Sequence, residues 1–200
     1  QDQAQAESYL TCDAPMPDPF LMTDMDKAAG RVGLAMERGE KIAVFGDYDV
    51  DGVTASVIME NALRLAGVKN LEIMLPDRFV DGYGMSPRLI TRAKDEKTTL
   101  VITVDCGSRN HEIIQELNEL GIDTIVTDHH ECRPELPDAL AVINPHRSDC
   151  DYPFKELAGV GVVFKFICAI EERLFGRTRR AAAEKIFESY ADLVAIGTIA

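Results

Sequence analysis

The 200-residue sequence predicts an α/β protein with a doubly wound, mainly parallel, five-stranded sheet flanked by helices. Two observations predict this class. Short apolar runs alternate along the chain with amphipathic segments of helical length, the order expected of βαβ units. The runs are also apolar at consecutive positions, which is typical of strands buried on both faces. The predicted strands are residues 42–45, 71–75, 100–104, 122–126 and 140–143.

Helices are predicted between the strands and after the last one. Thr23 or Asp24 is a candidate cap for the first helix, and Gly39, Gly67 and Gly121 stand where helices commonly end. No further strand signal follows position 159, so the end of the chain is predicted to be a helical extension packed on the sheet domain. The predicted helices cover residues 23–37, 53–66, 87–94, 111–120, 162–175 and 180–195.

Three parts are predicted along the chain. A proline at every second position from 15 to 19 indicates an irregular N-terminal arm. The α/β domain follows the arm, and the helical extension follows the domain. The predicted bounds are 1–22 for the arm, 23–158 for the α/β domain and 159–200 for the extension.

The composition is that of a globular protein, with 46% hydrophobic and 28% charged residues. The net charge of −13 argues against a broad basic surface that would bind nucleic acid electrostatically. No apolar run reaches about 18 residues, so no membrane-spanning helix is expected. The first 14 residues are polar and acidic, so no signal peptide is expected in the sequence as it stands. The 5 cysteines form no CxxC pair, which favours reduced thiols and a cytoplasmic location.

Acidic or imidazole side chains directly follow three of the predicted strands. Ligands of open parallel sheets bind at the carboxyl ends of the strands, and these ends meet at one edge. Clustered carboxylates repel one another unless a cation neutralises them, and carboxylates with imidazoles suit Mg²⁺ or Mn²⁺. Such a cluster can hold two ions, the arrangement that cleaves phosphate esters. The residues are Asp47, Asp49 and Asp51 after the first strand, Asp105 after the third, and Asp128, His129 and His130 after the fourth.

Each piece also has a simpler interpretation. The segment 47–52 begins like an EF-hand loop, but Ile58 occupies the twelfth position, where a bidentate Glu is needed, and a strand precedes the segment. Taken alone, Asp105 could cap the following helix, and Asp128 could begin a turn. Three such signals at one edge of the sheet favour a metal site over three unrelated local roles.

The ordered motifs resemble those of the DHH phosphoesterase superfamily, which is named for the triplet at 128–130. The resemblance runs from about position 18 to the last residue and is strongest to the RecJ-type single-strand-specific 5′ exonucleases. GDYDVDG at 46–52 is similar to the family's first motif, and LAGVG at 157–161 is similar to a downstream segment. Other similar segments are 18–20, 25–28, 76–78, 81–84, 104–107, 127–131 and 144–145.

The resemblance implies a two-metal phosphodiesterase that uses Mn²⁺ or Mg²⁺ and an activated water. Its expected activity is 5′→3′ exonucleolytic cleavage of single-stranded DNA in repair and recombination. By position, Asp49, Asp51, Asp105 and His129 match the family's metal ligands, with Asp105 bridging two ions. Asp47 is a further candidate ligand in the same loop.

The resemblance also gives roles to the rest of the triplet. His130 matches a position that contacts the scissile phosphate or orients ligands, and Asp128 matches one that fixes His129. Three residues are candidate substrate contacts on their own chemistry. Arg78, in a loop with Tyr83, could bind phosphate or a base, with a plain surface loop as the alternative. Ser108 and Arg109 are the other two candidates. They stand at the start of a predicted helix beside Asp105 and could equally cap that helix.

The expected substrate is single-stranded DNA, with single-strand-binding protein or a helicase as candidate partners and no membrane. Residues 192–200 resemble the start of a fourth motif, whose metal-binding Asp would come next. We therefore expect the N-terminal catalytic half of a longer protein, without the DHH-associated domain, and weak or no activity from these 200 residues alone.

Alternative functions remain open at this point. One is a related enzyme acting on short oligonucleotides, cyclic dinucleotides or pyrophosphate, which would share the metal site. Another is a non-catalytic DHH scaffold that binds without cleaving, and a third is metal sensing or storage.

Overall fold

The computed structural model describes residues 16–81 and 84–200. Within these ranges five strands pair in parallel in the order β2-β1-β3-β4-β5. The predicted fold class is confirmed, and each predicted strand agrees with an observed one to within one residue at either end. The strands are β1 (Ile42–Gly46), β2 (Leu71–Met74), β3 (Leu100–Val104), β4 (Asp123–Thr127) and β5 (Ala141–Ile143).

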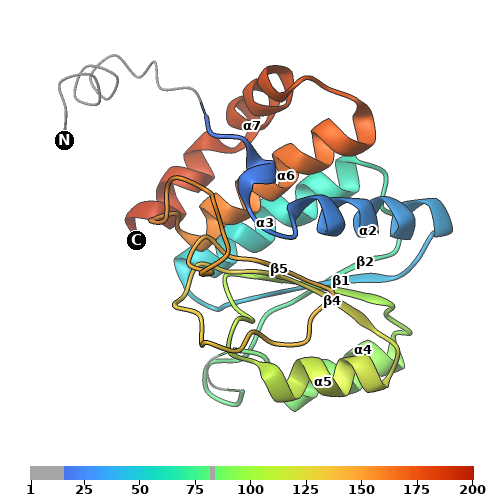
Figure 1. Cartoon of the computed structure of the whole chain (residues 1–200). Helices are drawn as coiled ribbons and strands as arrows, with labels where there is room; N and C mark the ends of the chain where they lie inside the picture. The colour runs from blue at the N-terminus through green and yellow to red at the C-terminus, as the bar shows by residue number, and fades with distance from the viewer. Residues whose placement is uncertain (1–15, 82–83) are drawn as a thin grey trace.

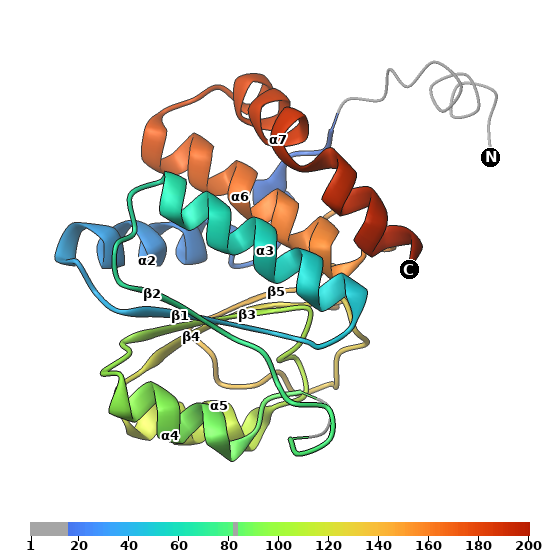
Figure 2. The same cartoon turned by 180° about the vertical axis from the view of Figure 1, so that it is seen from behind.

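Helices cover both faces of the sheet (Figure 1). On one face lie α2 (Met25–Arg38), α3 (Val50–Leu65) and α6 (Gly159–Phe175), with α7 (Arg179–Ile199) packed outside α3 and α6. The opposite face carries α4 (Pro87–Asp95) and α5 (His111–Glu119), as Figure 2 shows from behind. The chain is therefore a layered sandwich of helices, sheet and helices.

Alternating side chains of each inner strand enter two separate cores. In β1, Ile42 and Val44 pack toward α2, α3 and α6, whereas Ala43 and Phe45 pack toward α4 and α5. All residues of β1 are buried. Because both faces of the sheet are covered, consecutive positions must be apolar, and this explains the uninterrupted runs in the sequence.

The helix α6, which begins the segment predicted to be a helical extension packed on the sheet domain, lies at the centre of its layer. Every residue from Gly159 to Glu171 is buried, and α6 contacts α2, α3 and α7 as well as strands β3 and β4. Apart from Lys165 and Glu171, these buried residues are apolar on all sides of the helix, which is typical of such a position. It begins at Gly159, three residues before the predicted start, and so its first turn reaches the strand ends.

The described part of the N-terminal arm is ordered against the domain. Pro19–Leu21 form the 3-10 helix η1, and Asp18 caps it by accepting a hydrogen bond from the Phe20 N–H. Met22 is buried in the core beneath it. This segment is therefore more regular than predicted, while the rest of the predicted arm and Tyr83 lie outside the described residues.

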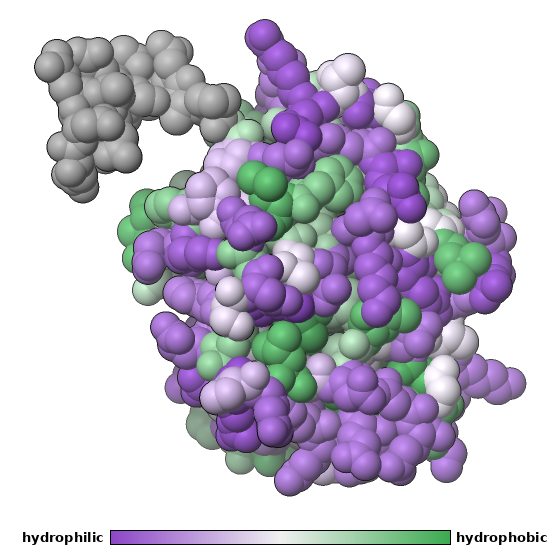
Figure 3. All heavy atoms as spheres, in the orientation of Figure 1, coloured by the Kyte–Doolittle hydropathy of each residue, from purple (hydrophilic) through white to green (hydrophobic). Residues whose placement is uncertain are grey.

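Hydrophilic side chains cover most of the face in Figure 3, and hydrophobic ones form small separate groups. In the described part of the chain, no helix is both long and apolar enough to cross a membrane. The four described cysteines are free thiols, as predicted, and Cys12 lies outside the described residues.

Candidate metal centre

The parallel register brings three aspartates to one edge of the sheet. The last residues of β1, β3 and β4 are paired neighbours, Gly46 with Val104 and Val104 with Thr127. In each strand the next residue in the chain is an aspartate. Because the three strands end at the same level, these aspartates lie at the same edge of the sheet. The three aspartates are Asp47, Asp105 and Asp128.

Two groups of side chains in this cluster could each hold a cation. Ligand atoms of Asp47, Asp49 and Asp105 all lie within 4.8 Å of one another. The same is true of Asp105, His129 and His130. Because Asp105 belongs to both groups, the described residues offer two adjoining sites with a shared carboxylate.

Asp105 is held in an unfavourable position that a cation would relieve. Its side chain is buried, and its backbone adopts a left-handed conformation with φ of 61°. Oδ1 lies 3.1 Å from His129 Nε2 but accepts no hydrogen bond from any described residue. Burial raises the pKa of Asp105 to about 7, and the Asp51 carboxylate adds to the rise, although His129 opposes it. A buried, unsatisfied carboxylate oxygen among acidic neighbours fits a divalent ion.

The loop after β1 presents two carboxylates and starts α3. Asp49 is exposed, and its Oδ1 accepts a hydrogen bond of 2.9 Å from Gly52 N–H as the N-cap of α3. This cap explains why α3 begins three residues before the predicted start. Asp47 is buried, and burial followed by the nearby Asp49 charge raises its pKa. A Cβ on Gly52 would lie 2.6 Å from the Asp47 Cβ, so only glycine permits this tight turn.

Asp51 faces the first turn of α6. Its Oδ2 accepts from Gly159 N–H and its Oδ1 from Val160 N–H, both at 2.7 Å. Oδ2 also lies 3.6 Å from His129 Nε2. Burial raises the pKa of Asp51, and the two backbone hydrogen bonds oppose that rise. Asp51 belongs to neither three-residue group, and its role as a metal ligand stays a prediction.

Asp128 holds the imidazole of His130. Oδ1 of Asp128 lies 2.7 Å from His130 Nδ1 and accepts from the backbone N–H groups of His129 and His130. Its Oδ2 accepts from Ser108 N–H at 2.8 Å. Burial opposes ionisation, but the hydrogen bonds from His130 and Ser108 outweigh it and lower the pKa of Asp128 to about 2. We predicted that Asp128 fixes His129; Asp128 holds the backbone N–H of His129, whereas the imidazole ring that it contacts is that of His130.

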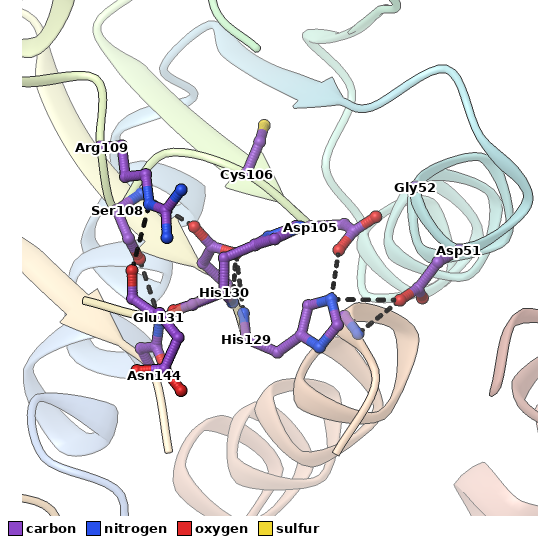
Figure 4. Close-up of polar contacts among 12 residues, drawn as sticks. Asp51, Gly52, Asp105, Cys106, Ser108, Arg109, His129, His130, Glu131 and Asn144 are labelled. Atoms are coloured by element: carbon purple, nitrogen blue, oxygen red, sulfur yellow. Dashed lines mark hydrogen bonds and ion pairs between the residues drawn. The ribbon is translucent and has the colours of Figure 1, made fainter. Parts of the chain in front are cut away.

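The candidate substrate contacts differ in position. Ser108 is fully buried with both its N–H and Oγ hydrogen-bonded inside the protein, which argues against direct contact with a substrate. Arg109 is exposed beside His130, and its Nε donates to the carbonyl of Glu131 (Figure 4). Arg78 lies between β2 and α4 and is exposed. Its guanidinium carbon is 5.3 Å from the centroid of the ring of Tyr48, which belongs to the β1–α3 loop. Arg78 and Tyr48 line a depression of about 430 Å³ that also includes Asp49.

Two residues that had no predicted role shape the centre. Asn144, directly after β5, is buried, and its Nδ2 donates to Ser108 Oγ and to the His130 carbonyl. A Cβ on Gly159 would lie 2.3 Å from Asp105 Oδ1, so the first turn of α6 touches the shared carboxylate. The position of Asn144 after a predicted strand was an available signal, whereas the contact of Gly159 depends on folding. In Figure 4 the His129 ring points at Asp105 and Asp51.

Residues 41–198 match the family described as DHH family, N-terminal domain. The single-stranded-DNA-specific exonuclease RecJ of Bacillus subtilis (strain 168) is 43% identical to the chain over 190 residues. That alignment covers 95% of this chain and 22% of the relative.

Two solved structures resemble the fold closely. A crystal structure of exonuclease RecJ bound to manganese gives a TM-score of 0.78 at 34% identity, covering 94% of this chain and 44% of that chain. RecJ from Thermus thermophilus in complex with Mn²⁺ gives 0.71 at 33% identity, covering 94% and 25%. The chain thus spans less than half the length of each of these proteins.

Proposed function

Because this chain belongs to the DHH family, we propose that it is the metal-binding catalytic part of a 5′→3′ exonuclease specific for single-stranded DNA. The observation that carries the proposal is the pair of three-residue groups that share Asp105. Relatives named as single-stranded-DNA-specific exonucleases support the substrate, and manganese-bound relatives support the metal.

The donor set suits Mn²⁺ or Mg²⁺. Carboxylate oxygens favour hard divalent cations, and an imidazole nitrogen favours Mn²⁺ among them. In our proposal Asp47, Asp49, Asp51, Asp105 and His129 hold two ions. The high pKa of Asp105 supports this assignment, because a cation would replace the proton that burial otherwise retains.

When bound, the two ions would offset phosphate charge and acidify the water that attacks phosphorus. The protein's own residues supply position. Asp128 orients the His130 ring through Nδ1, and we assign to His130 contact with the scissile phosphate. We assign to the exposed guanidinium groups of Arg109 and Arg78 contact with the negatively charged backbone of the DNA strand.

Single substitutions test the proposal in the full-length protein. Asp49→Ala, Asp105→Ala and His129→Ala are each expected to abolish Mn²⁺-dependent degradation of end-labelled single-stranded DNA with unchanged circular dichroism. Glu188→Ala is the matched control, because this exposed residue of α7 removes one charge away from the centre. Near-normal rates in all three centre variants would exclude the proposed function.

The same assay separates the alternatives. Faster turnover of dinucleotides than of long strands would indicate a small-molecule phosphodiesterase. Tight Mn²⁺ binding with no cleavage of any phosphodiester by the full-length protein would indicate a binding scaffold. The cytoplasmic location, the predicted domain bounds, the partners (single-strand-binding protein or a helicase) and the weak activity of these 200 residues alone stay predictions.

A further inference from the structure

Asn144 closes a ring of four hydrogen-bonded residues behind the metal centre. Its two Nδ2 protons go to Ser108 Oγ and to the His130 carbonyl oxygen, both at 2.9 Å. Ser108 N–H donates to Asp128 Oδ2, and Asp128 Oδ1 holds His130 Nδ1. The ring therefore runs from Asn144 through Ser108, Asp128 and His130 back to Asn144. Figure 4 labels three of its members, Ser108, His130 and Asn144.

The ring joins the ends of three strands. Ser108 belongs to the loop after β3, Asp128 and His130 directly follow β4, and Asn144 directly follows β5. Asn144, Ser108 and Asp128 are buried, so their hydrogen bonds lie in a low-dielectric interior, where they are stronger than in water. The Asn144 carboxamide is fully used, because Oδ1 also accepts from His146 N–H at 2.8 Å.

We propose that Asn144 is a positioning residue of the candidate metal centre. Asn144 fixes the position of the loop that carries His129 and His130 relative to Asp105. The role rests on the proposed metal-dependent function. Asn144 touches no candidate ligand atom, since its contact with His130 is to the backbone carbonyl. It acts through Ser108 and the loop, in the way that outer residues of metal sites orient the ligands.

Imidazole spectra of the metal-free chain test the positioning directly. The 200-residue chain contains 4 histidines, so this chain, labelled with ¹⁵N, gives four ring spin systems. Asn144→Ala is expected to shift the ring signals of His129 and His130 and to leave those of His111 unchanged. Asn118→Ala is the matched control, because its Nδ2 likewise holds a loop carbonyl, that of Asp138, near the other end of α5.

Mn²⁺ calorimetry tests the consequence for the centre. Asn144→Ala is expected to raise the Mn²⁺ dissociation constant about tenfold, whereas Asn118→Ala leaves it unchanged. Ser108→Ala removes one of the two acceptors at little cost in packing and is expected to give a smaller change in the same direction. This variant keeps the test decisive if Asn144→Ala does not fold.

The outcomes separate this inference from the proposed function. Wild-type imidazole signals in both Asn144→Ala and Ser108→Ala, or wild-type Mn²⁺ affinity in both, would overturn the role of Asn144. A wild-type chain that binds no Mn²⁺ would instead overturn the metal-dependent function, and the metal-free spectra would still decide whether Asn144 positions the histidines.

Discussion

Asp105 is the residue on which both candidate cation sites depend. It is buried, has a left-handed backbone and lies within reach of carboxylates on one side and imidazoles on the other. Gly159 matters because it has no side chain: the space that a side chain would fill is occupied by the Asp105 carboxylate. The carboxylate shared by the two candidate cation sites therefore lies where a side chain at position 159 would lie.

Gly159→Ala should damage the centre through this contact. A Cβ 2.3 Å from Asp105 Oδ1 forces either α6 or the carboxylate to move. We expect Mn²⁺ affinity to fall at least tenfold and the free energy of unfolding to fall by about 1–3 kcal/mol. Calorimetry and urea unfolding measure the two effects.

Gly161→Ala is the control on the same helix. The atoms nearest to its Cβ would be those of the Leu157 side chain, the closest at 3.2 Å, and this side chain can move aside. Equal loss of Mn²⁺ affinity in both variants would show that the contact with Asp105 is not the cause.

The stability of the metal-free chain should fall as pH rises from about 4 to 7. Burial raises the pKa of Asp105 from 3.8 to about 7, so over this range the folded chain keeps a proton that the unfolded chain has released. The free energy of unfolding then decreases with pH. The raised pKa values of Asp47 and Asp51 act in the same direction.

Urea unfolding in EDTA at several pH values measures this slope. Asp105→Asn cannot titrate and should flatten the curve between about pH 4 and 7. Parallel curves for the wild type and Asp105→Asn would contradict the assignment.

At the scale of elements, the centre is built where helix starts meet strand ends. Asp49 caps α3, which begins at the next residue. Asp51 instead accepts hydrogen bonds from the first N–H groups of α6, more than a hundred residues away in the chain. Such backbone groups have no partner within their own helix. The carboxylate of Asp51 thereby ties α6 to α3 at the edge of the metal centre.

Comparing two substitutions of Asp51 separates its charge from its hydrogen bonds. Asp51→Asn keeps an acceptor oxygen for α6, whereas Asp51→Ala leaves the N–H groups of Gly159 and Val160 unpaired. Without metal, Asp51→Ala is expected to be less stable than Asp51→Asn by about 1–3 kcal/mol. Both should lose Mn²⁺ affinity if Asp51 is a ligand.

Urea unfolding in EDTA measures the difference between the two variants. Thr178→Ala serves as a reference, since Thr178 caps α7 within its own segment and lies on another helix. Equal stability of Asp51→Ala and Asp51→Asn would mean that Asp51 does not support α6.

At the scale of the whole molecule, the candidate metal centre joins the sheet to one helical layer. Its residues follow the ends of β1, β3 and β4, and the first turn of α6 donates a hydrogen bond to Asp51 among them. A cation that binds only this assembled state must stabilise the entire fold. Part of the net charge of −13 is also concentrated here, where two divalent ions would offset about four charges.

Mn²⁺ should therefore raise the melting temperature. Free Mn²⁺ at about 100 times its dissociation constant adds about 2.7 kcal/mol to the free energy of unfolding. For a chain of this size the shift is roughly 5–10 °C. Differential scanning calorimetry with and without EDTA measures it. Asp49→Ala should lose the shift and Glu188→Ala should keep it; an undiminished shift in Asp49→Ala would place the bound ion elsewhere.

The sequence by itself determined the strands, the fold class and the acidic residues at the strand ends. Apolar runs and the residues that follow them are local features, so a single chain segment reveals each of them. Only the tertiary structure decided that α6 lies inside its layer, that Ser108 is buried and that Asn144 and Gly159 contact the centre. These outcomes depend on strand order and helix packing, which bring together segments far apart in the chain. No local pattern records which helix start will face a given carboxylate, because that choice is made when the layers pack.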